Sequence, residues 1–492
     1  MTDPVPVPVA ERSQARRFVA LIVIGAATAQ VLGLTLRMPT QLTANDISRW
    51  CTVWSLLERG TYAIDDCPWQ ANTQDKVRRE VGVEAAGKEG EASKPVFHVY
   101  SSKPPLLPTV IAGILYPFRA ATGVPLDKVV DQVRVGRNVE KPLKDNPNKT
   151  EFVREVGPPV PWPAYVFYFK PIVVLFNVVP FALFLVYYAR LLDRFAANDW
   201  AWFLSLFAAA FGNLLVVFNT TLNNHTIAAY AAFFAILPLA RIWDEDGGRP
   251  VDYALAGFFG ALCAVNELPS ALFGVLLFAL LAIRSPMLSL KFFTPAALIP
   301  IVAHLATQYL ALGTFRPAYE DWGTAAYNYE GSYWNDPLEF DWFTKHPESK
   351  ALYLFHMTLG HHGVFSLTPI FAFAFIAGIR NAFGKGRPLR VVSAVTVFLT
   401  VAMLAFYTWN PKARNYGGST QGLRWLFWLI PFWLVTLPTG LAEGQERAWP
   451  RRLSLAALSF SVLSVGYAMR SPWSHPWILD LLEHLDLYHL VR

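Results

Sequence analysis

The chain has 492 residues, of which 54% are hydrophobic, 15% aromatic and only 16% charged. This composition excludes a soluble protein built of several ordinary domains and predicts a polytopic membrane protein. The formal net charge is +6, but its sign is less informative than the positions of Lys and Arg relative to the apolar runs. Nothing in the sequence supports nucleic-acid binding.

A polar and basic N-terminus, residues 1–17, leads into an apolar run at residues 18–36. A membrane-spanning helix needs ~20 apolar residues, so this run is long enough to cross. It is too long for the core of a signal peptide, and we expect an uncleaved first span. Together with ten similar runs it predicts an all-α membrane domain over residues 18–470, with about eleven spans. The other ten runs are residues 165–188, 201–218, 227–243, 253–265, 268–283, 292–312, 364–379, 391–409, 425–441 and 453–468.

One further run, residues 104–118, is short and rich in proline. If it does not cross the membrane, the N-terminus and all the short basic connectors lie on one side, as the positive-inside rule requires. If it crosses, the later basic connectors move to the opposite side from the N-terminus. The pattern therefore favours a re-entrant or interfacial helix and a cytoplasmic N-terminus. The non-cytoplasmic face then carries loops at residues 37–163, 313–363 and 410–424 and a C-terminal tail at residues 471–492.

The first of these loops opens with NDISRWCTVWSLLERGTYAID, residues 45–65. Its apolar residues recur at helical spacing and predict an amphipathic helix in the membrane interface. Asn45 or Asp46 suits the N-cap of this helix, and Asp46 is also a candidate catalytic carboxylate. In an oxidising compartment Cys51 and Cys67 are placed to form a disulfide, the alternative being two unlinked residues. The charged stretches at 75–91 and 127–154 offer no core and are expected to be solvated or partner-facing insertions.

Two other segments carry cations close to predicted spans. VYSSKPPLLP, residues 99–108, places Lys103 at the mouth of the proline-rich run, either as a snorkelling cation or as a ligand. NYGGSTQGLRWLFWLIP, residues 415–431, places Arg424 after a glycine-rich turn at the start of a span. Arg424 is there either an anchor in the interface or a group that meets a lipid phosphate.

The order of these features resembles the GT-C superfamily of integral-membrane glycosyltransferases. The likeness is to the branch with protein O-mannosyltransferases, lipid A aminoarabinose transferases and Rgt-like bacterial transferases. It covers the layout of the first half of the chain, with motif matches at residues 45–62 and 101–108, and a later one at residues 415–431. It implies a GT-C-like fold and transfer of a sugar from a polyprenyl-phosphate donor on the outer face.

The resemblance implies that Asp46 lies at the catalytic centre, as a general base or as part of a metal site. A carboxylate can accept the proton that an acceptor hydroxyl loses as it attacks the anomeric carbon. The leaving phosphate needs cations, and Arg424, Lys103 and Arg414 are the outer candidates. Several relatives carry a second acidic residue where this chain has NTTLNNHT, residues 219–226. The sequence therefore does not specify a metal, although Mg²⁺ or Mn²⁺ remains an option.

Other polar residues at the outer ends of spans are candidates for substrate binding. Neutral amide and imidazole groups can bond to sugar hydroxyls, and a carboxylate at membrane depth is costly and tends to be functional. The alternatives are an ordinary polar loop for residues 219–226 and structural or interfacial roles for the others. The candidates are Asn45, Glu267, Asn223, Asn224, His225, His361 and His362.

The sequence thus predicts an inverting glycosyltransferase in a membrane, most simply the inner membrane of a bacterium. Its partners are a polyprenyl-phosphate-linked sugar and an acceptor that is a lipid, a glycan or a protein. A flippase or transporter is one alternative, but its ionisable residues should lie in mid-span and its halves should repeat. A sugar-polymer ligase is the other, and its main functional loop is expected later in the chain.

Overall fold

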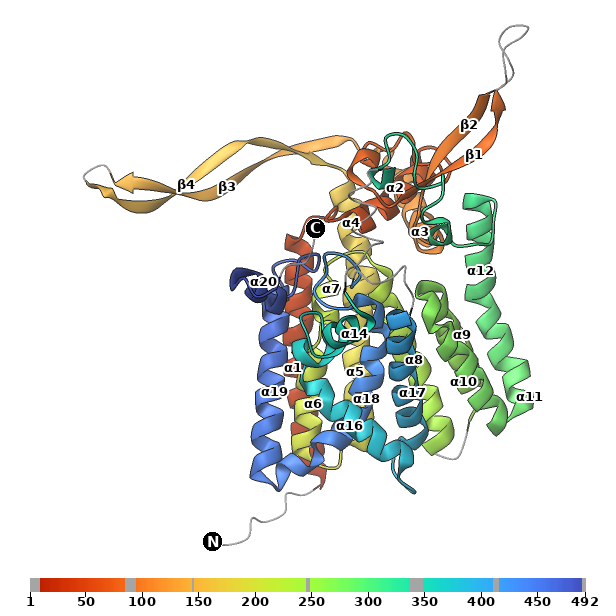
Figure 1. The fold of residues 1–492 in the computed structure, drawn as a ribbon, viewed down its shortest axis with the longest axis vertical. Helices are drawn as coiled ribbons and strands as arrows, with labels where there is room; N and C mark the ends of the chain where they lie inside the picture. Colours follow the sequence, from red (N-terminus) through yellow and green to blue (C-terminus); the bar gives the residue numbers. More distant parts are fainter. Residues whose placement is uncertain are drawn as a thin grey trace.

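The computed structural model describes residues 9–84, 94–143, 146–244, 248–335, 348–409 and 416–488, and the fold is 71% helical. Long helices stand side by side in a bundle, and two β-hairpins project from one end of it (Figure 1). The N-terminus lies at the opposite end of the bundle, whereas the C-terminal segment returns to the end that carries the hairpins. We call these the N-terminal end and the hairpin end.

The longer helices follow the order of the predicted apolar runs. They are α1 (Val9–Arg37), α2 (Ala44–Glu58), α3 (Leu106–Thr122), α4 (Tyr165–Val173), α5 (Val179–Phe195), α6 (Asp199–Phe211), α8 (Asn224–Asp244), α9 (Pro250–Asn266), α10 (Ala271–Arg284), α12 (Thr294–Leu312), α14 (Lys350–Thr358), α16 (Ile370–Phe383), α17 (Arg390–Trp409), α18 (Ile430–Leu441), α19 (Ala448–Ala468) and α20 (Trp477–His484). Short helices are α7 (Leu215–Phe218), α11 (Pro286–Leu288), α15 (Val364–Leu367) and η8 (Arg424–Leu429). The π-helical turns η2 (Val174–Val178) and η4 (Ser289–Phe293) join α4 to α5 and α11 to α12.

All eleven predicted runs form helix, and seven of the helical segments are long and apolar enough to cross a membrane. The structure thus shows a largely helical fold suited to a membrane, while the count of eleven spans stays a prediction. Three of the other four runs lie in shorter apolar helices, and the last lies in α19, whose first turns carry Arg451 and Arg452. The seven segments are Gln14–Arg37, Tyr165–Phe195, Asp199–Phe218, Asn224–Asp244, Pro286–Leu312, Arg390–Trp409 and Arg424–Gln445.

The proline-rich run forms α3, which lies beside α2 at the hairpin end rather than along the bundle (Figure 1). The two helices share a small apolar core in which Trp50 stacks on Phe169 of α4, with ring centroids 3.8 Å apart. A bidentate ion pair between Arg119 and Glu58, with both N–O distances 2.8 Å, joins the far ends of α2 and α3. This placement fits an interfacial or re-entrant helix.

The two charged stretches that we expected to be solvated or partner-facing insertions contribute strands to two antiparallel hairpins. β1 (Lys76–Glu84) pairs with β2 (Lys94–Ser101), and β3 (Val129–Leu143) pairs with β4 (Asn146–Pro163). The expectation failed for β1 because its core comes from a distant loop: Val77 is fully buried against Ala318, Tyr327 and Trp334.

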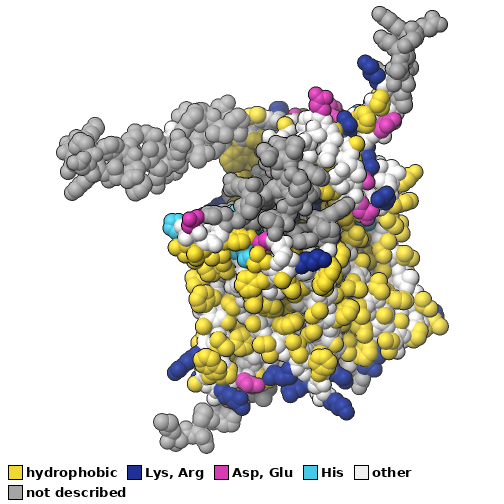
Figure 2. Space-filling view, viewed as in Figure 1, with side chains coloured by type: hydrophobic (Ala, Val, Ile, Leu, Met, Phe, Trp, Pro, Cys, Tyr) yellow, Lys and Arg dark blue, Asp and Glu magenta, His cyan; other side chains and the backbone are white. Residues whose placement is uncertain are grey.

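Charge and apolar surface are segregated along the bundle. Figure 2 shows hydrophobic side chains over the flank of the bundle and Lys and Arg gathered at the rim of the N-terminal end. Within the bundle the helices approach closely at small residues, as they do in membrane proteins. At Gly257 of α9, for example, a Cβ atom would collide with the backbone of Phe293.

We expect the two ends of the bundle to face opposite sides of the membrane. A reporter fused after Arg194, at the N-terminal end of the bundle, should be active in the cytoplasm, and one fused after Gly331 should be active on the other side. The basic rim of the N-terminal end sets this orientation. Reporters active on the same side would contradict the arrangement.

Candidate functional site

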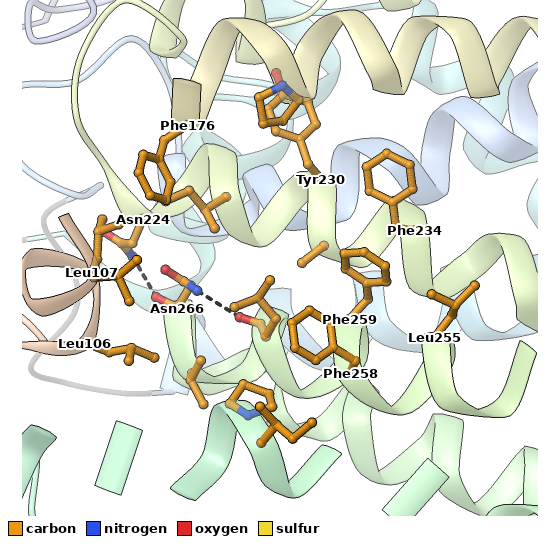
Figure 3. Close-up of a pocket in the computed structure, with 18 of the residues that line it drawn as sticks. Leu106, Leu107, Phe176, Asn224, Tyr230, Phe234, Leu255, Phe258, Phe259 and Asn266 are labelled. Atoms are coloured by element: carbon orange, nitrogen blue, oxygen red, sulfur yellow. Dashed lines mark hydrogen bonds between the residues drawn. The ribbon is translucent and has the colours of Figure 1, made fainter. Parts of the chain in front are cut away.

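A cavity of about 800 Å³ runs along one face of α8 and is lined also by α3, α5, α9 and α12. Its walls are almost wholly apolar, with Phe234, Phe258 and Phe259 among the side chains that point into it (Figure 3). The α8 residues that line it recur every three or four positions, from Asn224 to Arg241, so it follows the helix for ~25 Å at 1.5 Å per residue. Polar side chains gather at its two ends: Arg49, Asn224 and Asn266 near the hairpin end, and Arg241 at the other.

Arg49 of α2 stands at the hairpin end of this cavity. Its side chain is only 1% exposed, and it donates hydrogen bonds to the Asn45 carbonyl oxygen at 2.9 Å and to the Asn224 side-chain oxygen at 2.6 Å. It also contacts the side-chain oxygen of Asn45. Burial lowers the pKa of Arg49 to about 10, and the nearby Asp75 carboxylate opposes this shift. A buried guanidinium at the mouth of an apolar cavity is suited to an anionic group on a long apolar molecule.

Two of the predicted cations lie in the same electrostatic cluster as Arg49. Lys103 forms an ion pair with Asp75, with Nζ and Oδ2 2.9 Å apart. Burial lowers the pKa of Lys103, and the positive charges of Arg49 and Arg424 add to that effect while Asp75 opposes it. Asp75 interacts electrostatically with all three cations. The structure therefore brings Lys103 and Arg424 together, as the sequence predicts, whereas Arg414 lies outside the described residues.

Arg424 carries hydrogen-bond donors that the described part of the chain leaves unused. Its Nε and Nη1 atoms are buried and have no hydrogen-bond partner there. The guanidinium carbon lies 4.8 Å from the centre of the Trp473 ring, and Gly417 packs so closely that a Cβ atom there would lie 3.0 Å from Nε. Gly417 has φ +91°, which also favours glycine. Buried unsatisfied donors are uncommon in proteins and mark a place for an acceptor such as a phosphate.

Asp46 caps its own helix. Thr43 is the N-cap, and the Asp46 Oδ1 atom accepts from the Thr43 and Ile47 backbone N–H groups at 2.8 and 2.9 Å, which completes a capping box. The carboxylate is 1% exposed, and burial raises its pKa to about 6 although hydrogen bonds from Thr43, Leu42 and Thr221 lower it. The prediction that Asn45 or Asp46 is the N-cap is therefore wrong, because Thr43 holds that position and Asp46 closes the capping box from the third helical residue. A catalytic role of Asp46 would be additional to this capping.

A chain of contacts joins Asp46 to Arg424. The Thr221 hydroxyl donates to Asp46 Oδ2 at 3.2 Å and accepts from the Trp473 indole at 3.4 Å. Trp473 is the residue that lies against the Arg424 guanidinium. Four segments that are far apart in the sequence thus meet at one place at the hairpin end.

Three predicted substrate-binding residues form a second group beside Arg49. The Asn224 amide donates to Glu267 Oε1 at 2.6 Å and to the Asn266 carbonyl at 2.8 Å, and His225 contacts the same Oε1 atom. Glu267 is 6% exposed at the end of α9. Asn45 contributes through Arg49, whose side chain it orients.

The remaining predicted residues have other positions. Asn223 uses its amide within its own turn, where it donates to the Phe218 and Thr221 carbonyls and accepts from Thr226 N–H. His361 and His362 are buried and adjacent, with their Nδ1 atoms 2.5 Å apart, in a turn that does not line the cavity.

The Cys51 and Cys67 side chains meet in the core shared by α2 and α3. Their Sγ atoms lie 2.6 Å apart, and both are free thiols. The structure thus confirms that Cys51 and Cys67 lie next to each other. The disulfide between them stays a prediction.

Arg49 and Asp75 were missed by the sequence reasoning. A usable signal was present for Arg49, because it follows Asn45 by four residues and so shares its helix face. Asp75 gave no such signal, since it stands in a polar stretch that lacks a pattern.

The fold is that of a helical integral membrane protein with an apolar cavity and a buried charged cluster at one end. Comparison with known protein families and with curated proteins finds no match for this chain. The chemistry of the site is therefore argued from its own residues.

The raised pKa of Asp46 predicts a particular dependence of stability on pH. Between about pH 4 and pH 6 the folded protein holds the Asp46 proton more tightly than the unfolded chain does. The contribution of this carboxyl to stability therefore falls as the pH rises through that window, by ~3 kcal/mol in all. Asp46→Asn should consequently gain stability relative to wild type as the pH is raised from about 4 to 7, as measured by thermal unfolding in detergent.

The exposed carboxyl of Asp66 supplies the control, because its ion-pair partner among the described residues is the exposed Arg59. Asp66→Asn should show little change in relative stability over the same range. If the difference in stability between Asp46→Asn and wild type stayed constant with pH, the raised pKa of Asp46 would be contradicted.

Proposed function

We propose that the protein transfers a sugar from a polyprenyl-phosphate donor to an acceptor at the hairpin end of the bundle. The observation that carries the proposal is the apolar cavity along α8, which ends at the buried side chain of Arg49. By the positive-inside pattern the hairpin end is the non-cytoplasmic face. The resemblance to bacterial GT-C members supports the inner membrane of a bacterium as the location.

The cavity suits the polyprenyl chain. A polyprenyl chain enters this cavity from the lipid, so its transfer exposes no apolar surface to water, and the apolar walls hold it by van der Waals contact. The apolar walls reject a sugar, and they keep the hydrophilic head of the donor at the hairpin end. A path for moving a sugar head across the membrane would need polar side chains along it, so this feature favours a transferase over a flippase.

The cationic cluster suits the phosphate. Arg49 reaches the cavity directly, and Arg424 has free donors that a phosphate oxygen can accept from. Charge-assisted bonds from guanidinium groups are the stronger kind, and they gain further as negative charge grows on the leaving phosphate. Lys103, just before α3, adds positive charge through its place in the same cluster.

The reaction is a displacement at the anomeric carbon. The acceptor oxygen forms a bond to that carbon while the bond from the carbon to the phosphate oxygen breaks, so the configuration inverts and polyprenyl phosphate leaves. The proton of the acceptor hydroxyl passes to the Asp46 carboxylate, whose pKa of about 6 keeps it ionised at neutral pH and able to accept a proton. Asn224, His225 and Glu267 are placed to bond the hydroxyls of the sugar.

A sugar-polymer ligase would use the same lipid chemistry with a larger donor. The two functions differ in substrate: a ligase takes a lipid-linked oligosaccharide, whereas the proposed enzyme takes a single sugar on a polyprenyl monophosphate. Transfer from a polyprenyl-monophosphate sugar but not from a lipid-linked oligosaccharide would distinguish the proposed enzyme from a ligase.

We expect Arg49→Gln to weaken donor binding at least tenfold, because it removes a buried charge that meets the phosphate. The measurement is sugar transfer by purified protein in detergent, as a function of donor concentration, with membrane extract as acceptor. Arg59→Gln is the matched control, since Arg59 follows α2 directly but is about half exposed and paired with Asp66. If donor affinity fell equally in the two variants, or fell in neither, the result would count against Arg49 as a donor-binding residue.

Asp46→Asn should reduce the maximal transfer rate at saturating donor by a factor of ~10² or more, the usual contribution of a general base. The wild-type rate should rise with pH through about 6 and then level off, since the reactive form of Asp46 is the carboxylate. Glu267→Gln tests the other carboxylate near the cavity. A full rate in Asp46→Asn together with loss in Glu267→Gln would move the base to Glu267.

A further inference from the structure

A second polar cluster lies at the hairpin end and is not part of the proposed transfer site. Glu348, His356 and His361 are 7%, 6% and 0% exposed, and one potential ligand atom from each lies within 4.8 Å of the others. In the described ranges these three form the one group of His, Cys, Asp and Glu side chains that converges in this way.

Local structure brings the three side chains together. Glu348 lies next to Ser349, the N-cap of α14, and its Oε1 atom is 3.8 Å from Nε2 of His356, about two turns further along. The chain turns sharply at Gly360, where a Cβ atom would collide with His356, and the turn lays the His361 ring on the His356 ring. The ring centres are 3.9 Å apart and the rings are inclined by 23°.

Neighbouring groups orient two of these side chains. The hydroxyls of Tyr416 and Tyr488 each donate to a different oxygen of Glu348. His361 Nδ1 faces His362 Nδ1 at 2.5 Å, so Nε2 is the ring nitrogen of His361 that would meet a cation. Such outer hydrogen bonds are typical of metal sites, where they fix the ring orientation and the carboxylate.

We propose that Glu348, His356 and His361 bind one zinc-type divalent cation. Two imidazole nitrogens and one carboxylate oxygen suit Zn²⁺, whereas Mg²⁺ and Mn²⁺ prefer oxygen ligands. In a tetrahedral zinc site with bonds of 2.0–2.1 Å the ligand atoms are ~3.3 Å apart. On binding, the side chains would therefore close inward and the stacked rings of His356 and His361 would tilt apart, because a bound ion lies in the plane of each imidazole ring. A fourth position remains for water.

The cation would tie together three segments of the chain. Glu348, His356 and His361 belong to the segment around α14, while Tyr416 and Tyr488 belong to the glycine-rich turn and the C-terminal tail. Tyr416 precedes Gly417, which packs on the Arg424 side chain. The metal would thus act at a distance from the cavity, by holding the turn that packs on Arg424. Binding of the metal itself is measured without the transfer reaction.

The test is a titration of the full-length protein with metal alone. Protein purified in detergent is stripped with a chelator and then titrated with Co²⁺, whose visible absorption reports nitrogen ligands and tetrahedral geometry, and with Zn²⁺ in competition with a chromogenic chelator. We expect one ion per chain and at least tenfold weaker binding in His356→Ala and in His361→Ala. His98→Ala is the control, because His98 lies on exposed β2 beside Asp65.

Tyr488→Phe keeps all three ligands and removes one hydrogen bond to Glu348, so it serves if the histidine variants fail to fold. We expect ~10-fold weaker binding in this variant, since an outer partner of a metal ligand is worth 10–100-fold. Mg²⁺ should not compete. Absence of cobalt absorption in the folded wild type, or affinities unchanged in all three variants, would reduce the cluster to a hydrogen-bonded network and overturn the proposal.

Discussion

The buried charge of Arg49 is the constraint on which the hairpin end depends. Removing a guanidinium from water costs several kcal/mol unless partners replace the lost hydration. The structure supplies Asn45 and Asn224 as hydrogen-bond acceptors and Asp75 as a counter-charge. These partners come from α2, from the start of α8 and from the segment before β1. Holding one side chain in place therefore requires that α2 lie across the end of the bundle.

The need to hold the partners of Arg49 in place also explains why polar side chains and a hairpin gather at one end of an apolar cavity. Asp75 is held by Lys103 and by Ser48, whose hydroxyl donates to the Asp75 carbonyl at 2.5 Å. Val77, two residues later, is buried against the loop that contains Tyr327. The β1–β2 hairpin thus anchors Asp75, which is the counter-ion of the cationic cluster.

The sequence was informative where a property repeats along the chain. Apolar runs of membrane length predicted the helices. The basic connectors predicted that Lys and Arg gather at the N-terminal end of the bundle, where Figure 2 shows them. Single residues at loop mouths were also located, since Lys103 and Arg424 do share a cluster. Apolar residues that face lipid, the core or a cavity look alike in a sequence, however. The sequence of α8 therefore did not predict the cavity along it.

What the sequence could not supply was contact between distant segments. Val77 of β1 is buried only because residues 318–334 cover it, and no local pattern reports that. On a helix, two adjacent side chains such as His361 and His362 cannot face one ion, so their sequence gives no metal signal. The structure places them instead in a turn, where His361 faces His356 and His362 supports it from behind.

The capping and catalytic roles of Asp46 draw on different oxygens. Oδ1 accepts from the backbone of Thr43 and Ile47, so it is occupied as long as α2 exists. Oδ2 accepts from the Leu42 backbone at 3.0 Å and from the Thr221 hydroxyl at 3.2 Å. A hydroxyl can rotate away without any change in the backbone, and an ionised carboxylate has about four lone-pair sites in all. An acceptor hydroxyl that took the place of the Thr221 contact would therefore meet a carboxylate already aligned by its helix, and the cap would remain intact during the proton transfer.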